Sequence, residues 1–199
     1  MKKSKKELEK LYNLWFDTNS SELLEGWPVE ERDANYYVNQ FYEKIVFDLP
    51  IPEQGKILVL GTHNCVSFDK LCKHFGYERC IGFDLFNPQN HPSVVIKDCD
   101  FLNNDDNFDI AFCHNDVGSF WHTPDLKLQC QNWAANNIIK GGYFLGNNNY
   151  NRPRIELENR MKEYGFKNYQ LLDQSKFDRN KITVPERILK GYMISEKVN

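Results

Sequence analysis

Two short segments in the middle of the chain place a glycine and an acidic residue at a spacing that suits nucleotide binding. Gly61 ends the apolar run 56–60, and Asp84 ends the apolar run 80–83, 23 positions after the glycine. If both runs are strands joined by a helix, the glycine permits a tight turn against a ligand. The carboxylate at the tip of the second strand can then hold the hydroxyl groups of a ribose. The pattern predicts a nucleotide-binding βαβ unit.

Further polar residues follow the other apolar runs of this region. Segments 98–101, 114–116 and 146–149 are rich in Asn, Asp and His, and each comes directly after an apolar run. In a doubly wound sheet, ligands bind at the carboxyl ends of the strands, which is where these segments are expected to lie. The alternative interpretation is a set of ordinary turns and helix caps, because Asn and Asp favour both.

Strands and helices are expected to alternate from residue 56 onward. The expected strands are 56–60, 80–83, 94–97, 108–113, 143–145, 169–172 and 188–194. Helices are expected at 67–75, 126–139 and 154–164, with Gly141 and Gly142 as the C-cap of the second. This alternation predicts an α/β fold with a doubly wound, mostly parallel Rossmann-like sheet of about seven strands.

The first 50 residues have a different character. Apolar residues recur at helical spacing in 5–16 and again in 30–47, and many of them are aromatic. Two short helices cannot bury that much aromatic surface alone. We therefore expect residues 1–50 to form an N-terminal helical cap that does not fold independently, and residues 51–199 to form the Rossmann-like domain.

Composition limits the classes of partner. The chain has 199 residues, a formal net charge of −3 and a pI of about 6.0, so it lacks the basic excess of a nucleic-acid-binding protein. No apolar run approaches the length of a membrane span, and no apolar segment of a secretory signal follows the basic start. We expect a cytoplasmic protein that binds neither nucleic acid nor membrane.

The six cysteines do not form a CxxC pair, and most lie in apolar segments. This distribution favours reduced cysteines in the core of a cytosolic protein, with a zinc site as the alternative. No metal site is predicted.

The order of the elements resembles the class I S-adenosylmethionine-dependent methyltransferases from residue 56 to about residue 195. The resemblance rests on a glycine after the first strand (Gly61), an acid at the end of the second (Asp84) and the segment after the third (98–101). It also rests on the fourth strand (108–112), a Lys-Gly-Gly entry to the fifth (139–144) and a closing Tyr-Gly-Phe (164–166). The resemblance implies a C-terminal antiparallel hairpin and S-adenosylmethionine as the cofactor.

The resemblance also implies a set of site residues. Cofactor contacts are expected at Gly61, Thr62, His63, Asp84, Asp98, Cys99, Asp100, Phe101 and His114. The candidates for serving the acceptor are His114, Asp116 and His122. A general base is useful if the acceptor is a hydroxyl, and an imidazole changes protonation near neutral pH. For His122 the alternative is an ordinary histidine in a surface loop.

The first loop departs from the family pattern. At the family's acid-x-Gly-x-Gly-x-Gly positions this chain has Val59, Gly61, His63 and Cys65, so one glycine of three is kept. The segment after the fourth strand lacks the Asp/Asn-Pro-Pro-aromatic signature of DNA amino-methylating enzymes. We predict methyl transfer to a small polar acceptor, such as a sugar or metabolite hydroxyl. The alternatives are a catalytically inactive methyltransferase-like binding or regulatory protein, and a Rossmann enzyme for another nucleotide, with NAD disfavoured because Gly-x-Gly-x-x-Gly is absent.

Overall fold

The structure is a computed structural model of the whole chain. It describes residues 6, 39, 42–62, 65–84, 86–87, 89–96, 108–115, 132–147, 159, 161–171 and 192–199. Within these ranges, no helix has the length and apolar character needed to cross a bilayer.

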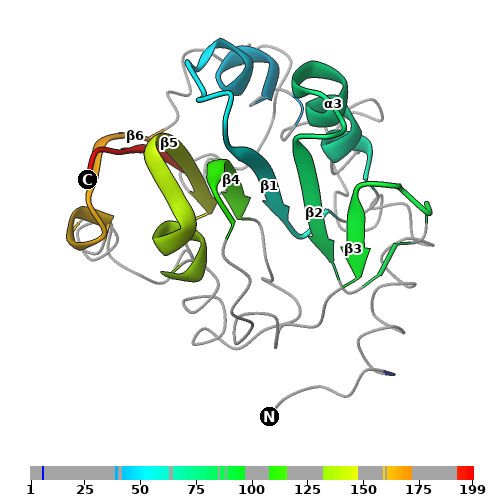
Figure 1. The fold of residues 1–199 in the computed structure, drawn as a ribbon. Coiled ribbons are helices and arrows are strands. Elements are labelled where there is room, and N and C mark those ends of the chain that lie inside the picture. Colours follow the sequence, from blue (N-terminus) through cyan, green and yellow to red (C-terminus); the bar gives the residue numbers. More distant parts are fainter. Residues whose placement is uncertain are drawn as a thin grey trace, which may run out of the picture.

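A seven-stranded mixed sheet organises the molecule, in the order β3-β2-β1-β4-β5-β7-β6 (Figure 1). Its strands are β1 Lys56–Leu60, β2 Cys80–Asp84, β3 Val94–Ile96, β4 Ile110–Asn115, β5 Ile138–Asn147, β6 Phe166–Leu171 and β7 Tyr192–Lys197. Strands β1 to β5 are parallel, whereas β7 runs antiparallel to both β5 and β6. The predicted α/β sheet, mostly parallel and closed by an antiparallel hairpin, is confirmed.

Strand order reverses between β1 and β4. From β1 the chain proceeds outward through β2 to β3, then returns to β4 on the other side of β1 and continues to β5. Parallel neighbours that lead in opposite directions leave a crevice at their carboxyl ends, and this is where open α/β sheets bind ligands. The predicted site residues Gly61 and His114 belong to these two strands or follow them directly.

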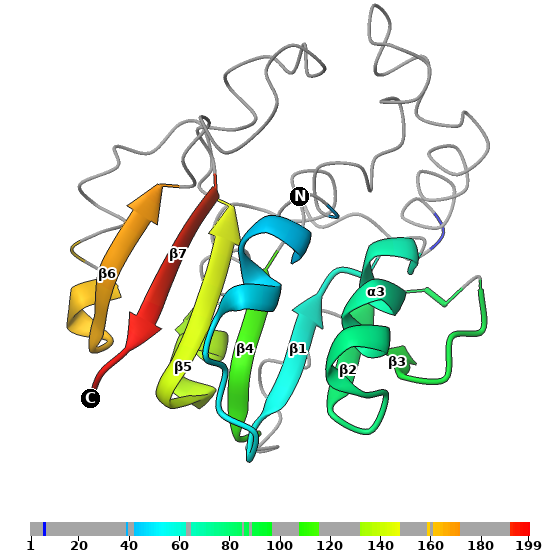
Figure 2. The same cartoon turned by 90° about the horizontal axis from the view of Figure 1, so that it is seen from above.

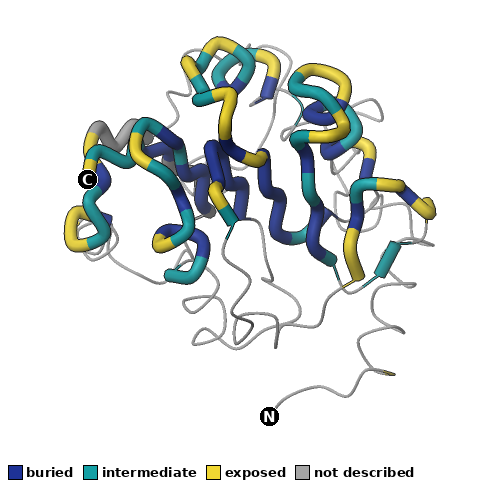
Figure 3. Tube along the Cα trace, viewed as in Figure 1, coloured by how far each residue is buried: buried dark blue, intermediate teal, exposed yellow. Residues whose placement is uncertain are grey.

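Two apolar clusters fill the two faces of the sheet. Helix α3, Val66–Phe75, and the segment 42–50 cover one face (Figure 2), and they contribute Phe68, Leu71 and Val46 to its cluster. Ala134 and Ala135 of the helical residues 132–137, together with Met161, belong to the cluster of the other face. The strands between these layers are largely buried, and exposed residues concentrate in the outer connections (Figure 3). Coverage on both faces explains why the central strands read as continuous apolar runs.

The described end of the predicted N-terminal cap packs onto the sheet. Residues 42–44 are helical, and the 3-10 helix η2, Val46–Asp48, follows them. Tyr42 is 1% exposed and Val46 is 0% exposed, both within the cluster on the α3 face. This segment therefore forms part of the main core. Whether residues 1–50 fold independently stays a prediction.

The predicted boundaries of two central elements are wrong. Strand β4 extends to Asn115, so His114 and Asn115 end the strand and do not lie in a following loop. Strand β5 already begins at Ile138, so the predicted C-cap glycines lie inside a strand. The pairing of β4 with β5 shifts register between Ile110 and Phe112, and Gly141 takes a φ of 80° at this irregularity. Glycine tolerates that backbone conformation, which is also common after the end of a helix. The Gly141-Gly142 dipeptide therefore resembles a helix end in the sequence.

The last two strands also differ from their expected ranges. Strand β6 begins three residues before the predicted 169–172, and β7 lies later than the predicted 188–194, ending at Lys197. Their antiparallel pairing, Phe166 with Lys197, sets these limits. Long-range pairing of this kind leaves little trace in a local apolar pattern.

Candidate functional site

The carboxyl ends of four strands meet at one edge of the sheet. Leu60 of β1 lies opposite Asn115 of β4 on one side and opposite Phe83 of β2 on the other. Asn115 in turn lies opposite Gly146 of β5. The residues that end or follow these strands are therefore level with one another. This register brings together the predicted site residues Gly61, Thr62, Asp84 and His114.

Gly61 begins the loop after β1 with a backbone that favours glycine. Its φ is 87°, in the left-handed region, and its N–H donates to the carbonyl oxygen of Phe83 at 2.8 Å. The hydrogen bond holds the start of the loop beside the tip of β2. The predicted tight turn after the first strand is thus present, and a side chain at Gly61 would be strained.

The Asp84 carboxylate lies at that tip with its orientation fixed. The Thr62 hydroxyl donates to Oδ2 at 3.3 Å, and the Phe86 N–H approaches Oδ1 at 3.5 Å. Thr62 is 5% exposed, and its methyl group occupies the space that a side chain at Gly82 would need. Asp84 itself remains partly exposed. A partly exposed carboxylate with a fixed orientation can accept two hydroxyl hydrogen bonds from a vicinal diol.

Cys65 has a left-handed backbone conformation that usually favours glycine. Its φ is 64° and its ψ is −3°, and it forms the N-cap of α3. Its N–H donates to the Thr62 carbonyl oxygen at 2.9 Å, while its own carbonyl accepts from Asp69 at 2.7 Å. The thiol packs in the core cluster on the α3 face and is 3% exposed. The missing family glycine is therefore replaced by a residue whose side chain points into the core.

Burial raises the pKa of the Cys65 thiol. A protonated, buried thiol is a poor nucleophile, so Cys65 acts as a small apolar residue here. The four described cysteines are buried, and none of them is disulfide-bonded. They are Cys65, Cys72, Cys80 and Cys113. The described residues hold no group of three His, Cys, Asp or Glu side chains that could bind a metal ion.

His114 is buried at the end of β4 and contacts the N-terminal segment. Its Nδ1 lies 2.6 Å from the hydroxyl oxygen of Tyr42, and the two rings meet edge to face with centroids 5.6 Å apart. His114 is 2% exposed and Tyr42 is 1% exposed. Sequence reasoning placed Tyr42 on the apolar side of a helix, and no local pattern could pair residues 72 positions apart.

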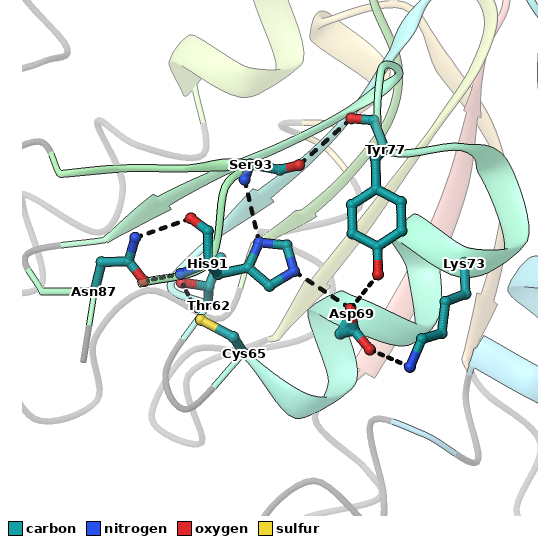
Figure 4. A network of polar contacts seen from close by, with 8 residues as sticks. All are labelled: Thr62, Cys65, Asp69, Lys73, Tyr77, Asn87, His91 and Ser93. Carbon is teal, nitrogen blue, oxygen red and sulfur yellow. Dashed lines mark hydrogen bonds and ion pairs between the residues drawn. The ribbon is translucent and has the colours of Figure 1, made fainter. Parts of the chain in front are cut away.

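A polar network fixes the connection between β2 and β3 onto α3 (Figure 4). Asp69 of α3 accepts from the Tyr77 hydroxyl at 2.5 Å and pairs with Lys73 at 2.5 Å. Its Oδ1 also lies 3.5 Å from Nε2 of His91, in the connection. Hydrogen bonds from Lys73 and Tyr77 lower the pKa of Asp69.

The other side of His91 is held within the same connection. Its ring Nδ1 accepts the Ser93 N–H at 3.2 Å. The Asn87 side chain accepts from the His91 N–H at 2.8 Å and donates to its carbonyl at 2.9 Å (Figure 4). The connection starts directly after Asp84, so the network fixes the chain that leaves the tip of β2. Sequence reasoning did not find His91, because a lone histidine in a polar loop gives no local signal.

The structure brings together four of the predicted site residues, Gly61, Thr62, Asp84 and His114. The others lie outside the described residues: His63, Asp98, Cys99, Asp100, Phe101, Asp116 and His122. Their roles stay predictions.

Several solved structures that are similar to this chain are methyltransferases. An S-adenosylmethionine-dependent methyltransferase from Clostridium acetobutylicum is similar with a TM-score of 0.57 and 12% identity, covering 95% of this chain and 100% of that one. The chain has the class I methyltransferase fold. No protein-family model and no curated protein matches its sequence.

Two further structures show the range of acceptors on this fold. The 1,6-didemethyltoxoflavin-N1-methyltransferase of Burkholderia thailandensis, solved with its acceptor and S-adenosylhomocysteine, has a TM-score of 0.55 at 13% identity and covers 99% of this chain and 92% of that one. An rRNA methylase from Streptococcus thermophilus has a TM-score of 0.51 at 12% identity, covering 82% and 95%. Similarity at this level establishes the fold, and the acceptor has to be argued from the chain itself.

Proposed function

We propose that this protein is an S-adenosylmethionine-dependent methyltransferase acting on a small polar acceptor, such as the hydroxyl of a sugar or metabolite. The observation that carries the proposal is the pairing of Gly61, left-handed at the start of the loop, with Asp84, oriented by Thr62 at the tip of β2. This is the arrangement that holds an adenosyl ribose at the carboxyl edge of a parallel sheet.

The backbone of the described loop residues supports cofactor binding despite the unusual sequence. Gly61 and Cys65 both have left-handed backbone, and the Cys65 thiol lies in the core. A side chain directed into the core leaves the outer surface of the turn to the ligand. We therefore assign Gly61 and Thr62 to the methionine end of the cofactor and Asp84 to its ribose. His63, Asp98, Cys99, Asp100 and Phe101 complete the proposed cofactor set.

The cofactor supplies a methyl group on a sulfonium, already activated for transfer, so the protein mainly positions the two partners. His114 is the proposed general base, taking the acceptor hydroxyl proton at Nε2 as the oxygen becomes nucleophilic. Its place at the end of β4, next to β1, supports this role. Asp116 and His122 are the alternative bases. The acidic composition supports a small molecule over a nucleic acid.

A second candidate is a catalytically inactive binding protein of the same fold. It is favoured by the burial of His114, which is 2% exposed and bonded to Tyr42. A buried base needs an acceptor that reaches into the sheet edge, whereas a binding protein needs none.

Calorimetric titration tests the proposal and separates it from its rivals. S-adenosylmethionine and S-adenosylhomocysteine should bind, and NAD should not. Binding with turnover on a panel of sugar and metabolite hydroxyls supports the enzyme, whereas binding without turnover favours the second candidate. NAD binding in place of both sulfur ligands would contradict the proposal.

A further inference from the structure

The contact between Tyr42 and His114 joins two distant parts of the chain at the proposed base. Tyr42 precedes the whole sheet, and His114 lies on its central strand β4. The 2.6 Å separation is that of a strong hydrogen bond between a hydroxyl and a ring nitrogen. Both side chains are almost fully buried, so water does not compete for the bond.

The surroundings of Tyr42 hold its hydroxyl in place. Val46, one helical turn later, is 0% exposed in the same core cluster, and Ile45, Phe47 and Leu49 pack against that cluster. His114 is equally constrained, because its strand pairs with β1 at Val59 and with β5 at Leu145. Two rigid elements therefore meet at this bond.

The direction of this bond sets which ring nitrogen of His114 carries the proton. An imidazole has two ring nitrogens, and Tyr42 occupies Nδ1. If Nδ1 carries the proton and donates to the Tyr42 oxygen, Nε2 has a lone pair and can accept a proton. If Tyr42 donates instead, Nε2 carries the hydrogen and can only donate. The partner of one ring nitrogen thus sets the role of the other.

We infer that Tyr42 is a positioning residue that accepts the Nδ1–H of His114 and so presents Nε2 as the proton acceptor. The inference rests on the proposed function, because it gives His114 the role of base. It also makes the segment before η2 part of the catalytic apparatus. Tyr42 touches neither partner of the reaction and acts only through His114.

Tyr42→Phe is the test, because it keeps the buried ring and removes only the oxygen. Tyr143→Phe is the matched control. Tyr143 is a half-buried tyrosine that packs against the same cluster, and it lies opposite Phe112, two residues before His114. Folding of each variant is checked by thermal unfolding and by titration with S-adenosylhomocysteine.

Two measurements decide the inference. In ¹⁵N spectra of the histidine side chains, with His114→Gln for assignment, the proton should lie on Nδ1 of His114 in the wild type and shift away from Nδ1 in Tyr42→Phe, while the other four histidines stay unchanged. In kinetics it should lower kcat roughly 10- to 100-fold, part of the range for a general base, with KM for the cofactor within about twofold. The control should alter neither.

The outcomes separate this inference from the proposed function. Wild-type protein that fails to bind S-adenosylmethionine overturns the proposed function. Wild-type protein that turns over, with Tyr42→Phe equally active, overturns the inference alone. If the wild type binds the cofactor without turnover, the nitrogen spectra decide. A wild-type proton on Nδ1 that shifts in Tyr42→Phe supports the positioning role, whereas a wild-type proton on Nε2 or an unchanged tautomer overturns it.

Discussion

The carboxylate of Asp84 is the residue on which cofactor binding should depend most directly. Asp84→Asn keeps the size of the side chain but replaces the charged carboxylate, whose oxygens accept hydrogen bonds from the ribose hydroxyls, with a neutral amide. Loss of hydrogen bonds to a charged group costs about 1.5–3 kcal/mol, so affinity for S-adenosylhomocysteine should fall roughly 10- to 100-fold in calorimetry. Asp109→Asn is the control, because Asp109 is exposed just before the opposite end of β4. Equal affinities for both variants and the wild type would remove Asp84 from the site.

Cys65 tests whether the first loop requires a left-handed backbone. A non-glycine residue there costs roughly 1–2 kcal/mol, and glycine relieves that strain while losing the buried thiol. Cys65→Gly should therefore stay within about 1 kcal/mol of the wild-type free energy of unfolding and still bind the cofactor. Cys65→Val should lose roughly 1–3 kcal/mol, because a β-branched residue is strained in this conformation.

Denaturant unfolding measures both Cys65 variants. Cys113→Val is the control, since Cys113 is equally buried but lies in strand β4, where β-branched residues are favoured. If the valine is tolerated equally at both positions, the loop does not depend on its left-handed residue.

At the scale of elements, the βαβ unit could be predicted and the limits of β4 and β5 could not. The run 56–60, α3 and the run ending in Asp84 each have a strong local pattern, and the structure reproduces them within a residue or two. The positions of Gly61 after β1 and of Asp84 at the end of β2 could be predicted for the same reason, because each ends an apolar run. The contact of Tyr42 with His114 depends on packing between distant segments, which periodicity does not encode.

The glycines of β5 show how a local signal can mislead. Gly141 and Gly142 look like a helix C-cap, yet both lie within β5, and Gly141 is left-handed where the pairing with β4 shifts register. A Cβ at Gly142 would lie 2.8 Å from the Ala111 carbonyl oxygen, and backbone cannot move aside easily. Ile138 and Ile139 of β5 itself lie almost as close to that position, so the folded β4–β5 pair, and not the local sequence, explains the requirement.

Gly142→Ala should therefore destabilise the sheet by about 1–3 kcal/mol, the usual cost of overpacking. Lys140→Ala, at an exposed position of the same strand, should remain within about 0.5 kcal/mol of the wild type. Urea unfolding followed by circular dichroism compares the two. If Gly142→Ala is as stable as the wild type, β4 and β5 can move apart to admit the methyl group without a loss of unfolding free energy.

At the scale of the whole molecule, the Asp69 network should make stability depend on pH at both extremes. The lowered pKa of Asp69 means that its carboxyl group binds a proton less tightly in the folded protein than in the unfolded chain. Its stabilisation is therefore complete above about pH 4, the ordinary range of an aspartate, and is lost as pH falls through the lower folded value. The Asp69 hydrogen bond raises the pKa of Tyr77 to about 12. The stabilisation by Tyr77 is complete below about pH 10, the ordinary pKa of a tyrosine, and is lost as pH rises through the folded pKa of about 12.

Asp69→Asn is the variant that removes this dependence at the acid end. At pH 7 it should lower Tm by roughly 2–4 °C, the shift expected for about 1 kcal/mol in a chain of this size. The difference from wild type should shrink steadily as pH falls below about 4, because the wild-type carboxylate is then also neutral. Glu53→Gln, at an exposed turn, serves as the control and should follow the wild-type curve throughout. Thermal scans from pH 2.5 to 8 supply the comparison; a Tm difference that is the same at every pH would show that Asp69 contributes through packing and not through its charge.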